Sequence, residues 1–306
     1  MDAAPRIRKA FHILLYFLQK LFCQLTFSRK WCIIGHRTNR FANIKEDNSM
    51  KKLCALLLAL AMMFAMTACG SSSDSEELIV FAAASMTETL TELGNQYMAE
   101  NENVTIVFNF DSSGTLKTQI QEGADCDIFI SAGQKQMDEL DCVLEGTRFD
   151  ILENKVALAV PDGNPAGIHS YGDMIAGLSD GTIMLAMGNG DVPVGQYTQK
   201  ILAYYGMNEE ALAAAGSITY GTNVKEVTTQ VSEAAVDCGI IYQTDAFSAG
   251  LTVADTATAE MCGQVIYPAA VLNTSKNAEA AEDFLEFLTS DAADEVFSRV
   301  GFTPVI

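Results

Sequence analysis

The chain has 306 residues, of which 49% are hydrophobic and 19% charged, with 39 acidic against 19 basic side chains. This length accommodates one large domain or two of ordinary size, and the apolar content excludes a disordered or low-complexity protein. The net charge of −20 argues against a nucleic-acid-binding protein, which would carry a basic surface.

The charge is unevenly distributed along the chain. Residues 1–49 hold nine of the basic residues and three acidic ones, whereas eight basic and 36 acidic residues follow Ala68, a net charge of about −28. Such a change marks a boundary between unlike segments. We interpret residues 1–49 as an upstream extension that precedes the true initiator Met50 and is not part of the mature protein. A basic amphipathic membrane anchor is the alternative.

Residues 50–68 have the layout of a signal peptide. Two lysines follow Met50, and Leu53–Ala68 is an uncharged apolar run that ends on small residues. It is too short to span a bilayer comfortably. Because Cys69 follows directly, the segment resembles a bacterial lipoprotein signal, in which that thiol is lipidated; a plain signal peptide with an incidental cysteine is the alternative. We therefore expect an exported protein, anchored at the outer face of the cytoplasmic membrane through a Ser-rich tether, residues 69–77.

Strand and helix patterns alternate from Leu78 onward. Short apolar runs predict buried strands at Leu78–Phe81, Val104–Phe110, Asp127–Ile130, Val156–Val160, Thr182–Ala186 and Gly239–Tyr242. Helical patterns separate these runs, and the first helix is expected to open with a capping box, Ser85–Glu88. Alternation of this kind predicts an α/β protein with mainly parallel sheets covered by helices.

The 238 residues from Cys69 to Ile306 fit two α/β lobes better than one. We expect lobe 1 to comprise residues 78–154 and 243–306 and lobe 2 to comprise residues 155–242, with crossings near Asn154 and Gln243. The body contains four cysteines, at positions 126, 142, 238 and 262. They form no CxxC motif or Cys/His cluster, so no metal site is expected and buried thiols are the preferred interpretation.

Small, hydroxyl-bearing or glycine-rich segments follow the predicted strands or open the predicted helices. These segments are residues 82–85, 111–115, 188–195, 222–224 and Tyr242. Parallel α/β sheets bind ligands at this end, where first-turn amides and the positive helix end stabilise anions. Taken singly, Ser85 and Ser113 could be ordinary N-caps and Tyr242 a structural tyrosine. Their convergence favours an anion-binding site.

Five segments resemble, in order and spacing, the molybdate-binding proteins of ABC transporters. They are Phe81–Thr87, Phe110–Leu116, Asp127–Ala132, Val192–Gly195 and Gly239–Ala246, and Tyr267-Pro268 and Arg299–Thr303 extend the match. The resemblance covers nearly the whole exported part, from Leu78 to Ile306. It implies a two-lobe fold of the type II periplasmic-binding-protein kind, with a hinge, and a substrate-binding lipoprotein.

The resemblance also implies a ligand and partners. The two lobes would close on molybdate or tungstate, with hydroxyls from Ser85, Ser113 and Tyr242 and backbone amides from Ser113, Val194 and Val224; the amide of Ser85 would be a possible addition. It implies a monomer that delivers the oxyanion to an ABC permease, with no cofactor, no direct cation site and no nucleic acid. A binder of sulfate or phosphate with the same fold is the alternative.

Three residues depart from the family pattern. Gly114 stands where a third serine is common and Val194 where alanine is common, but both roles there are backbone ones. Asp111 brings a carboxylate close to the second loop; we expect it to point away from the ligand or to hold the loop by hydrogen bonds. Lys117 and Lys225 are interpreted as solvated helix residues, so that hydroxyls and amides supply the donors that a dianion needs.

An enzyme is the competing class of protein. The sequence has no GxSxG, HExxH or GxxxxGK[ST] motif, and the one histidine of the body, His169, falls in a stretch rich in Pro and Gly that predicts a surface loop. A Ser/His hydrolase would need His169 beside Ser85 or Ser113, which the predicted lobes separate. We therefore expect binding without catalysis.

Overall fold

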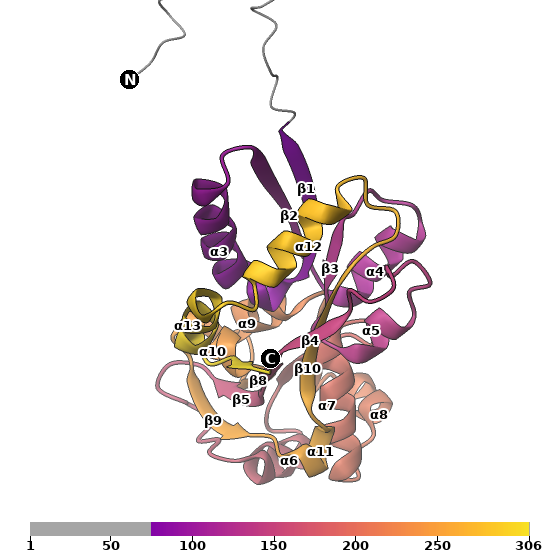
Figure 1. Cartoon of the computed structure of the whole chain (residues 1–306). Coiled ribbons are helices and arrows are strands. Elements are labelled where there is room, and N and C mark those ends of the chain that lie inside the picture. Colours follow the sequence, from indigo (N-terminus) through magenta and orange to yellow (C-terminus); the bar gives the residue numbers. More distant parts are fainter. Residues whose placement is uncertain (1–74, 306) are drawn as a thin grey trace, which may run out of the picture. The chain divides into compact units, whose positions relative to one another are not determined.

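The computed structural model describes residues 75–305 (Figure 1). The expectations for the upstream extension, the signal peptide, Cys69 and most of the tether lie outside these residues. Two separate β-sheets organise the described part, one of six strands and one of five. No helix in residues 75–305 is long and apolar enough to cross a membrane.

The first lobe is built on the six-stranded sheet, in the order β11-β4-β10-β3-β1-β2. Its strands are β1 (Glu76–Ala83), β2 (Val104–Asp111), β3 (Ile128–Ile130), β4 (Phe149–Asn154), β10 (Val265–Val271) and β11 (Thr303–Pro304). The central strand β1 pairs in parallel with β2 and β3, whereas β10 runs antiparallel to β3 and β4.

Helices cover both faces of this sheet. They are η1 (Ala84–Met86), α3 (Thr87–Glu100), α4 (Ser113–Gln121), α5 (Gln134–Asp138), α12 (Ala278–Phe287) and α13 (Asp291–Val300). Successive β1 side chains point to opposite faces. Val80 belongs to the core cluster that contains Leu90 and Phe284 of α3 and α12, while Phe81 joins Leu116 of α4 in a second cluster. This alternation explains why β1 is buried on both sides.

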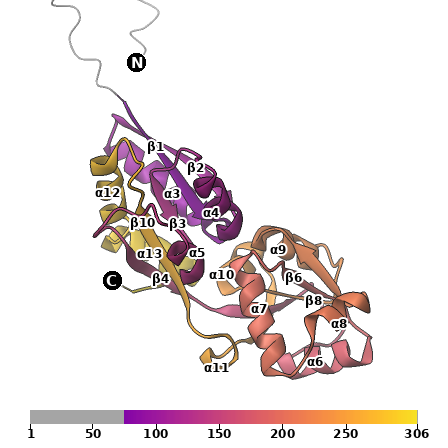
Figure 2. The same ribbon diagram turned by 90° about the vertical axis from the view of Figure 1, so that its right-hand side faces the viewer.

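The second lobe, which contains β6 and β8 (Figure 2), is built on the five-stranded sheet. The strand order in this sheet is β7-β6-β8-β5-β9. Its strands are β5 (Val156–Val160), β6 (Leu185–Gly188), β7 (Ile218–Gly221), β8 (Cys238–Tyr242) and β9 (Thr252–Thr256). Its helices are α6 (Tyr171–Asp180), α7 (Pro193–Tyr204), α8 (Glu209–Ala214), α9 (Val224–Ser232), α10 (Gln243–Ala249) and α11 (Ala259–Cys262). Strand β6 pairs in parallel with β7 and β8, and β5 runs antiparallel to β8 and β9.

The two-lobe α/β fold predicted from the sequence is confirmed, but the sheets are mixed rather than mainly parallel. Four of the antiparallel pairs come from β5 and β10, each of which has antiparallel neighbours on both sides, and β11 adds a fifth pair with β4. The sequence did not predict strands β4, β7, β9, β10 and β11. Several of these lie at sheet edges or are only partly buried, so they lack the continuous apolar run that marks a buried strand.

The chain passes between the lobes at two places. The first passage lies between Asn154 and Val156, where it was predicted. The second was predicted near Gln243, but β9 still pairs with β5, so the chain returns only between Thr256 and Val265. Gln243 remains beside the first passage, because its backbone N–H donates to the Lys155 carbonyl at 2.9 Å.

Candidate functional site

All five residues predicted to contact a ligand line one small cavity between the lobes. The lining consists of Ala83, Ala84, Ser85, Asp111, Ser112, Ser113, Ala132, Val192, Pro193, Val194, Val224 and Tyr242. Its volume is about 10 Å³, comparable with the space that holds one water molecule. In this arrangement the cleft excludes drug-sized organic solutes, whose pockets span about 300–1,000 Å³.

Ser113 begins helix α4 and is not its N-cap. The cap is Ser112, whose Oγ accepts the Thr115 backbone N–H at 3.1 Å. The Oγ of Ser113 instead accepts the backbone N–H of Ala132 at 2.9 Å. Because that bond occupies an acceptor site, the hydroxyl proton of Ser113 remains available to donate into the cleft.

Ser85 lies in η1, and the predicted capping box is not formed. The N-cap position of α3 belongs to Met86 and uses no side-chain hydrogen bond. The Oγ of Ser85 lies 2.9 Å from the hydroxyl oxygen of Tyr267 on β10, which also accepts from the Asn154 side chain at 3.2 Å. The inserted turn of η1 thus directs Ser85 into the cleft instead of back along α3.

Tyr242 ends β8 and occupies the N-cap position of α10. The side chain is fully buried, and its hydroxyl donates to the Ala132 carbonyl at 3.5 Å, a long hydrogen bond. Burial, followed by the neighbouring Tyr267 and Tyr197, raises the pKa of Tyr242 well above its usual value. The phenol therefore stays protonated at neutral pH, and its single proton can turn from the long bond with Ala132 to a ligand.

The second lobe contributes two helix N-termini. Helix α7 begins with Pro193, which has no N–H, so Val194 carries its first amide. Helix α9 begins at Val224, behind the N-cap Asn223, whose side chain accepts the Glu226 N–H at 3.1 Å. First-turn amides have no acceptor within their own helix, and the positive end of the helix dipole favours an anion there.

Asp111 holds its loop by hydrogen bonds, which was one of the two predicted possibilities. Its Oδ1 accepts the Ser112 backbone N–H at 2.7 Å and the Asn223 side-chain N–H at 3.2 Å. The second bond joins β2 of the first lobe to the cap of α9 in the second lobe. Part of the negative charge of Asp111 is therefore taken up by protein donors at the edge of the cleft.

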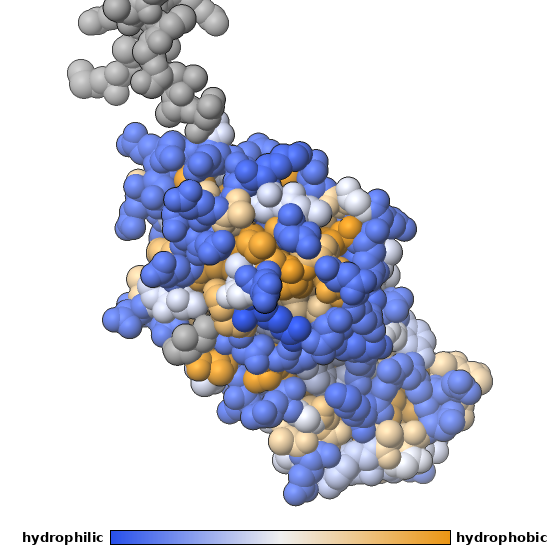
Figure 3. Space-filling model, turned by 45° about the vertical axis from the view of Figure 1, so that its right-hand side comes forward, coloured by the Kyte–Doolittle hydropathy of each residue, from blue (hydrophilic) through white to orange (hydrophobic). Residues whose placement is uncertain are grey.

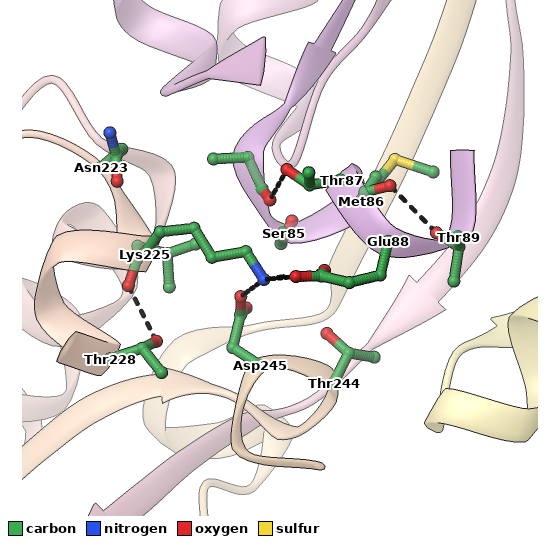
Figure 4. A network of polar contacts seen from close by, with 12 residues as sticks. Ser85, Met86, Thr87, Glu88, Thr89, Asn223, Lys225, Thr228, Thr244 and Asp245 are labelled. Atoms are coloured by element: carbon green, nitrogen blue, oxygen red, sulfur yellow. Dashed lines mark hydrogen bonds and ion pairs between the residues drawn. The ribbon is translucent and has the colours of Figure 1, made fainter. Parts of the chain in front are cut away.

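The predictions for two lysines were wrong. Lys117 forms an ion pair with Glu139 within the first lobe. The Nζ of Lys225 lies 2.9 and 2.8 Å from the two carboxylate oxygens of Glu88 and 3.3 Å from Oδ1 of Asp245 (Figure 4). Helix position alone gave no sign of these partners, because Glu88 lies 137 residues away along the chain.

His169 and the four cysteines of the body do not line the cleft. His169 is exposed in the loop before α6, where its backbone N–H donates to Asp173. Within residues 75–305 no cluster of His, Cys, Asp and Glu could hold a metal ion, and the four cysteines there are unpaired thiols. Two larger hollows, of about 390 and 640 Å³, are lined in part by charged side chains. The first includes Glu122 and Glu139 together with Lys117 and Lys135, and the second includes Glu282 and Glu286 together with Asp150 and Asp283.

Comparison with known proteins adds to this geometry. A model of the bacterial extracellular solute-binding protein family matches residues 78–303. The chain belongs to this family. Two known relatives each align with 83% of this chain over 98% of their own length. They are YvgL of Bacillus subtilis, which is named as an ABC transporter substrate-binding lipoprotein, at 30% identity, and the molybdate-binding protein ModA of Haemophilus influenzae, at 31% identity.

Solved structures agree on the fold. The periplasmic molybdate-binding protein of Azotobacter vinelandii matches with a TM-score of 0.65 at 23% identity, covering 74% of this chain and 98% of that one. The sulfate-binding protein SubI of Mycobacterium tuberculosis matches with a TM-score of 0.61 at 18% identity, covering 75% and 87%. Likeness at this level of identity shows the fold alone.

Proposed function

We propose that this solute-binding protein captures molybdate or tungstate between its two lobes and delivers it to an ABC permease. The ligand would be held by the hydroxyls of Ser85, Ser113 and Tyr242 and by the backbone amides of Ser113, Val194 and Val224. Because a tetrahedral oxyanion is larger than the cavity of about 10 Å³, the loops that line the cavity would shift slightly around it while the lobes stay in contact.

One observation carries the proposal: the cleft offers donors that are neutral and buried. No Lys, Arg or His is among the residues that line it. A fully deprotonated dianion needs donors alone, and hydroxyls plus first-turn amides supply them without a cation. A hydrogen phosphate ion would need an acceptor for its proton; Asp111 is the one carboxylate in the lining, and its Oδ1 accepts two hydrogen bonds from the protein.

The remaining parts of the proposal come from the relatives and the sequence. The family and the name of ModA support transport of an oxyanion by an ABC system. The lipoprotein-like segment that ends at Cys69 supports a lipid anchor on the outer face of the cytoplasmic membrane. We further propose that the protein acts as a monomer, uses no cofactor and catalyses no reaction on its ligand.

Isothermal titration of the purified protein with molybdate, tungstate, sulfate and phosphate tests this proposal. We expect tight one-to-one binding of molybdate and tungstate, with no measurable heat from sulfate or phosphate. Preferential binding of sulfate would keep the fold assignment and replace the ligand. Binding of phosphate alone would indicate that Asp111 accepts the ligand's proton, and no binding of any of the four would contradict the oxyanion assignment.

A further inference from the structure

A charged cluster lies beside the cleft and joins the two lobes. Lys225 follows Val224 in the first turn of α9, in the second lobe, and its Nζ contacts both carboxylate oxygens of Glu88 on α3, in the first lobe. The same Nζ lies 3.3 Å from Oδ1 of Asp245 on α10, within the second lobe. Figure 4 shows the ammonium group between the two carboxylates.

Asp245 has a different environment from Glu88. Its side chain is completely buried, and neither carboxylate oxygen has a hydrogen-bond partner in the part of the chain that the structure describes, so Lys225 is the cation that compensates its charge. The Glu88 side chain is 52% exposed. Asp245 therefore holds Lys225 in place within one lobe, while Glu88 approaches from the other.

We propose that Glu88, Lys225 and Asp245 form an interlobe ion cluster that stabilises contact between the lobes and thereby raises the affinity of the cleft for its anion. This inference rests on the proposed function and adds three positioning residues that do not line the cleft. The Lys225–Glu88 bonds form only when the lobes approach each other, so they stabilise the closed state. Because the ligand also stabilises the closed state, the two contributions to its free energy add.

The position of Lys225 links the cluster to the binding groups. Its backbone directly follows Val224, whose amide is one of the proposed donors, and the N-cap Asn223 bonds Asp111 across the lobes. Closure thus fixes the first turn of α9 at two points on either side of Val224. Pre-organised donors lose less conformational freedom when the anion binds, which strengthens binding.

The solvent exposure of the two side chains sets the expected size of their effect on anion affinity. The Lys225 and Glu88 side chains are 31% and 52% exposed, so solvent screens their attraction. Exposed ion pairs of this kind change an equilibrium by roughly twofold to fivefold. We therefore expect removal of the Glu88 charge to weaken anion binding by about threefold, with most of the change in the dissociation rate.

The test compares Glu88→Gln with Glu92→Gln. Glu92 lies one turn further along the same helix α3 and pairs with Arg299 of α13, which belongs to the same lobe. Both substitutions remove one carboxylate and one ion pair, but only Glu88→Gln removes a bond between lobes. Titration with molybdate would give the dissociation constants, and small-angle X-ray scattering would give the radius of gyration with and without molybdate.

We expect Glu88→Gln to bind molybdate about threefold more weakly than wild type and to have a larger radius of gyration, while Glu92→Gln matches wild type in both. Lys225→Arg, which keeps the charge, should remain within twofold of wild type. Equal affinities and radii for the two glutamine variants would overturn the ion cluster. Failure of the wild-type protein to bind any oxyanion would instead overturn the proposed function, and the cluster would then be judged by the radii alone.

Discussion

Each hydroxyl in the cleft is held by a protein partner that fixes its position. Ser113 accepts an amide proton from Ala132, Ser85 contacts Tyr267, and Tyr242 makes only the long bond to the Ala132 carbonyl. A donor that is already oriented and desolvated interacts strongly with an anion, because no water must be displaced and no rotamer fixed on binding. Affinity at this site should therefore respond to the loss of a single hydroxyl.

Tyr242→Phe tests this expectation at one atom. Removing a hydrogen bond to a charged group costs about 1.5–3 kcal/mol, so we expect the dissociation constant for molybdate to rise about tenfold or more. Tyr171→Phe is the matched control, because Tyr171 is equally buried but lies on α6 with a hydroxyl that has no partner within the described residues. Isothermal titration measures both; similar affinities for the two variants would contradict a ligand-binding role for Tyr242.

Asp245 should make stability depend on pH. Burial, only partly offset by Lys225, raises the pKa of this carboxyl from 3.8 to about 6. Between about pH 4 and pH 6 the folded state therefore binds more protons at this residue than the unfolded state does. The contribution of Asp245 to the free energy of unfolding consequently falls as pH rises through this window and is constant above it.

The variant Asp245→Asn removes that contribution. We expect the unfolding free energy of the variant, relative to wild type, to increase as pH rises from 4 to 6 and then to level off, by roughly 3 kcal/mol in total. Urea denaturation at several pH values measures this difference. A difference that does not change with pH would show that Asp245 has an ordinary pKa.

At the scale of secondary structure, the cleft is made by helix N-termini from both lobes. Helix α4 comes from the first lobe and α7 and α9 from the second, and each begins directly after a strand or a short loop at the cleft. Their amides can reach one small anion only if the backbones approach closely. Gly114 in α4 permits this approach, because a Cβ there would lie 2.1 Å from the Asp191 carbonyl oxygen of the other lobe.

Gly114→Ala should therefore impair contact between the lobes without unfolding either one. Overpacking typically costs about 1–3 kcal/mol, so we expect molybdate affinity to fall about tenfold while the thermal midpoint of the ligand-free protein stays within about 2 °C. In the control Gly190→Ala, the nearest atom to the added Cβ would be the side chain of Gln199 at 3.7 Å, an ordinary contact. Equal affinity of the two variants would show that α4 does not approach Asp191 when the anion is bound.

At the scale of the whole molecule, a strongly acidic protein is proposed to bind an anion. The chain carries a net charge of −20, and hydrophilic side chains dominate the face drawn in Figure 3. This charge repels an approaching dianion at long range, whereas the donors act only at short range. Salt shortens the range of the repulsion from about 30 Å at 0.01 M to about 8 Å at 0.15 M ionic strength.

We accordingly expect the association rate constant for molybdate to increase by about threefold or more between 0.01 M and 0.15 M NaCl. Stopped-flow measurements of tyrosine fluorescence would follow the reaction at each NaCl concentration, because the one tryptophan of the chain, Trp31, lies in the upstream extension. A rate constant that falls with added salt would mean that a local positive potential at the cleft, such as that of the helix N-termini, attracts the anion.

Features that depend on residues close together in the chain could be predicted from the amino-acid sequence. Buried strands such as β1 and β5 show as apolar runs, and the small residues that follow strands predicted where ligand-binding loops begin. In each lobe the carboxyl ends of the parallel strands and the helix N-termini that follow them share one edge of the sheet, and the five proposed ligand residues from the two lobes line one cleft.

Contacts between segments that lie far apart in the chain became visible only in the folded protein. The bond between Ser85 and Tyr267 spans 182 residues, and the ion pair between Glu88 and Lys225 spans 137. Local patterns assigned Ser85 and Glu88 to a capping box and Lys225 to solvent, because a sequence shows spacing along a helix but not which element packs against it. Packing of the lobes replaced these local partners with distant ones, and the buried charge of Asp245 exists only because the folded chain encloses it.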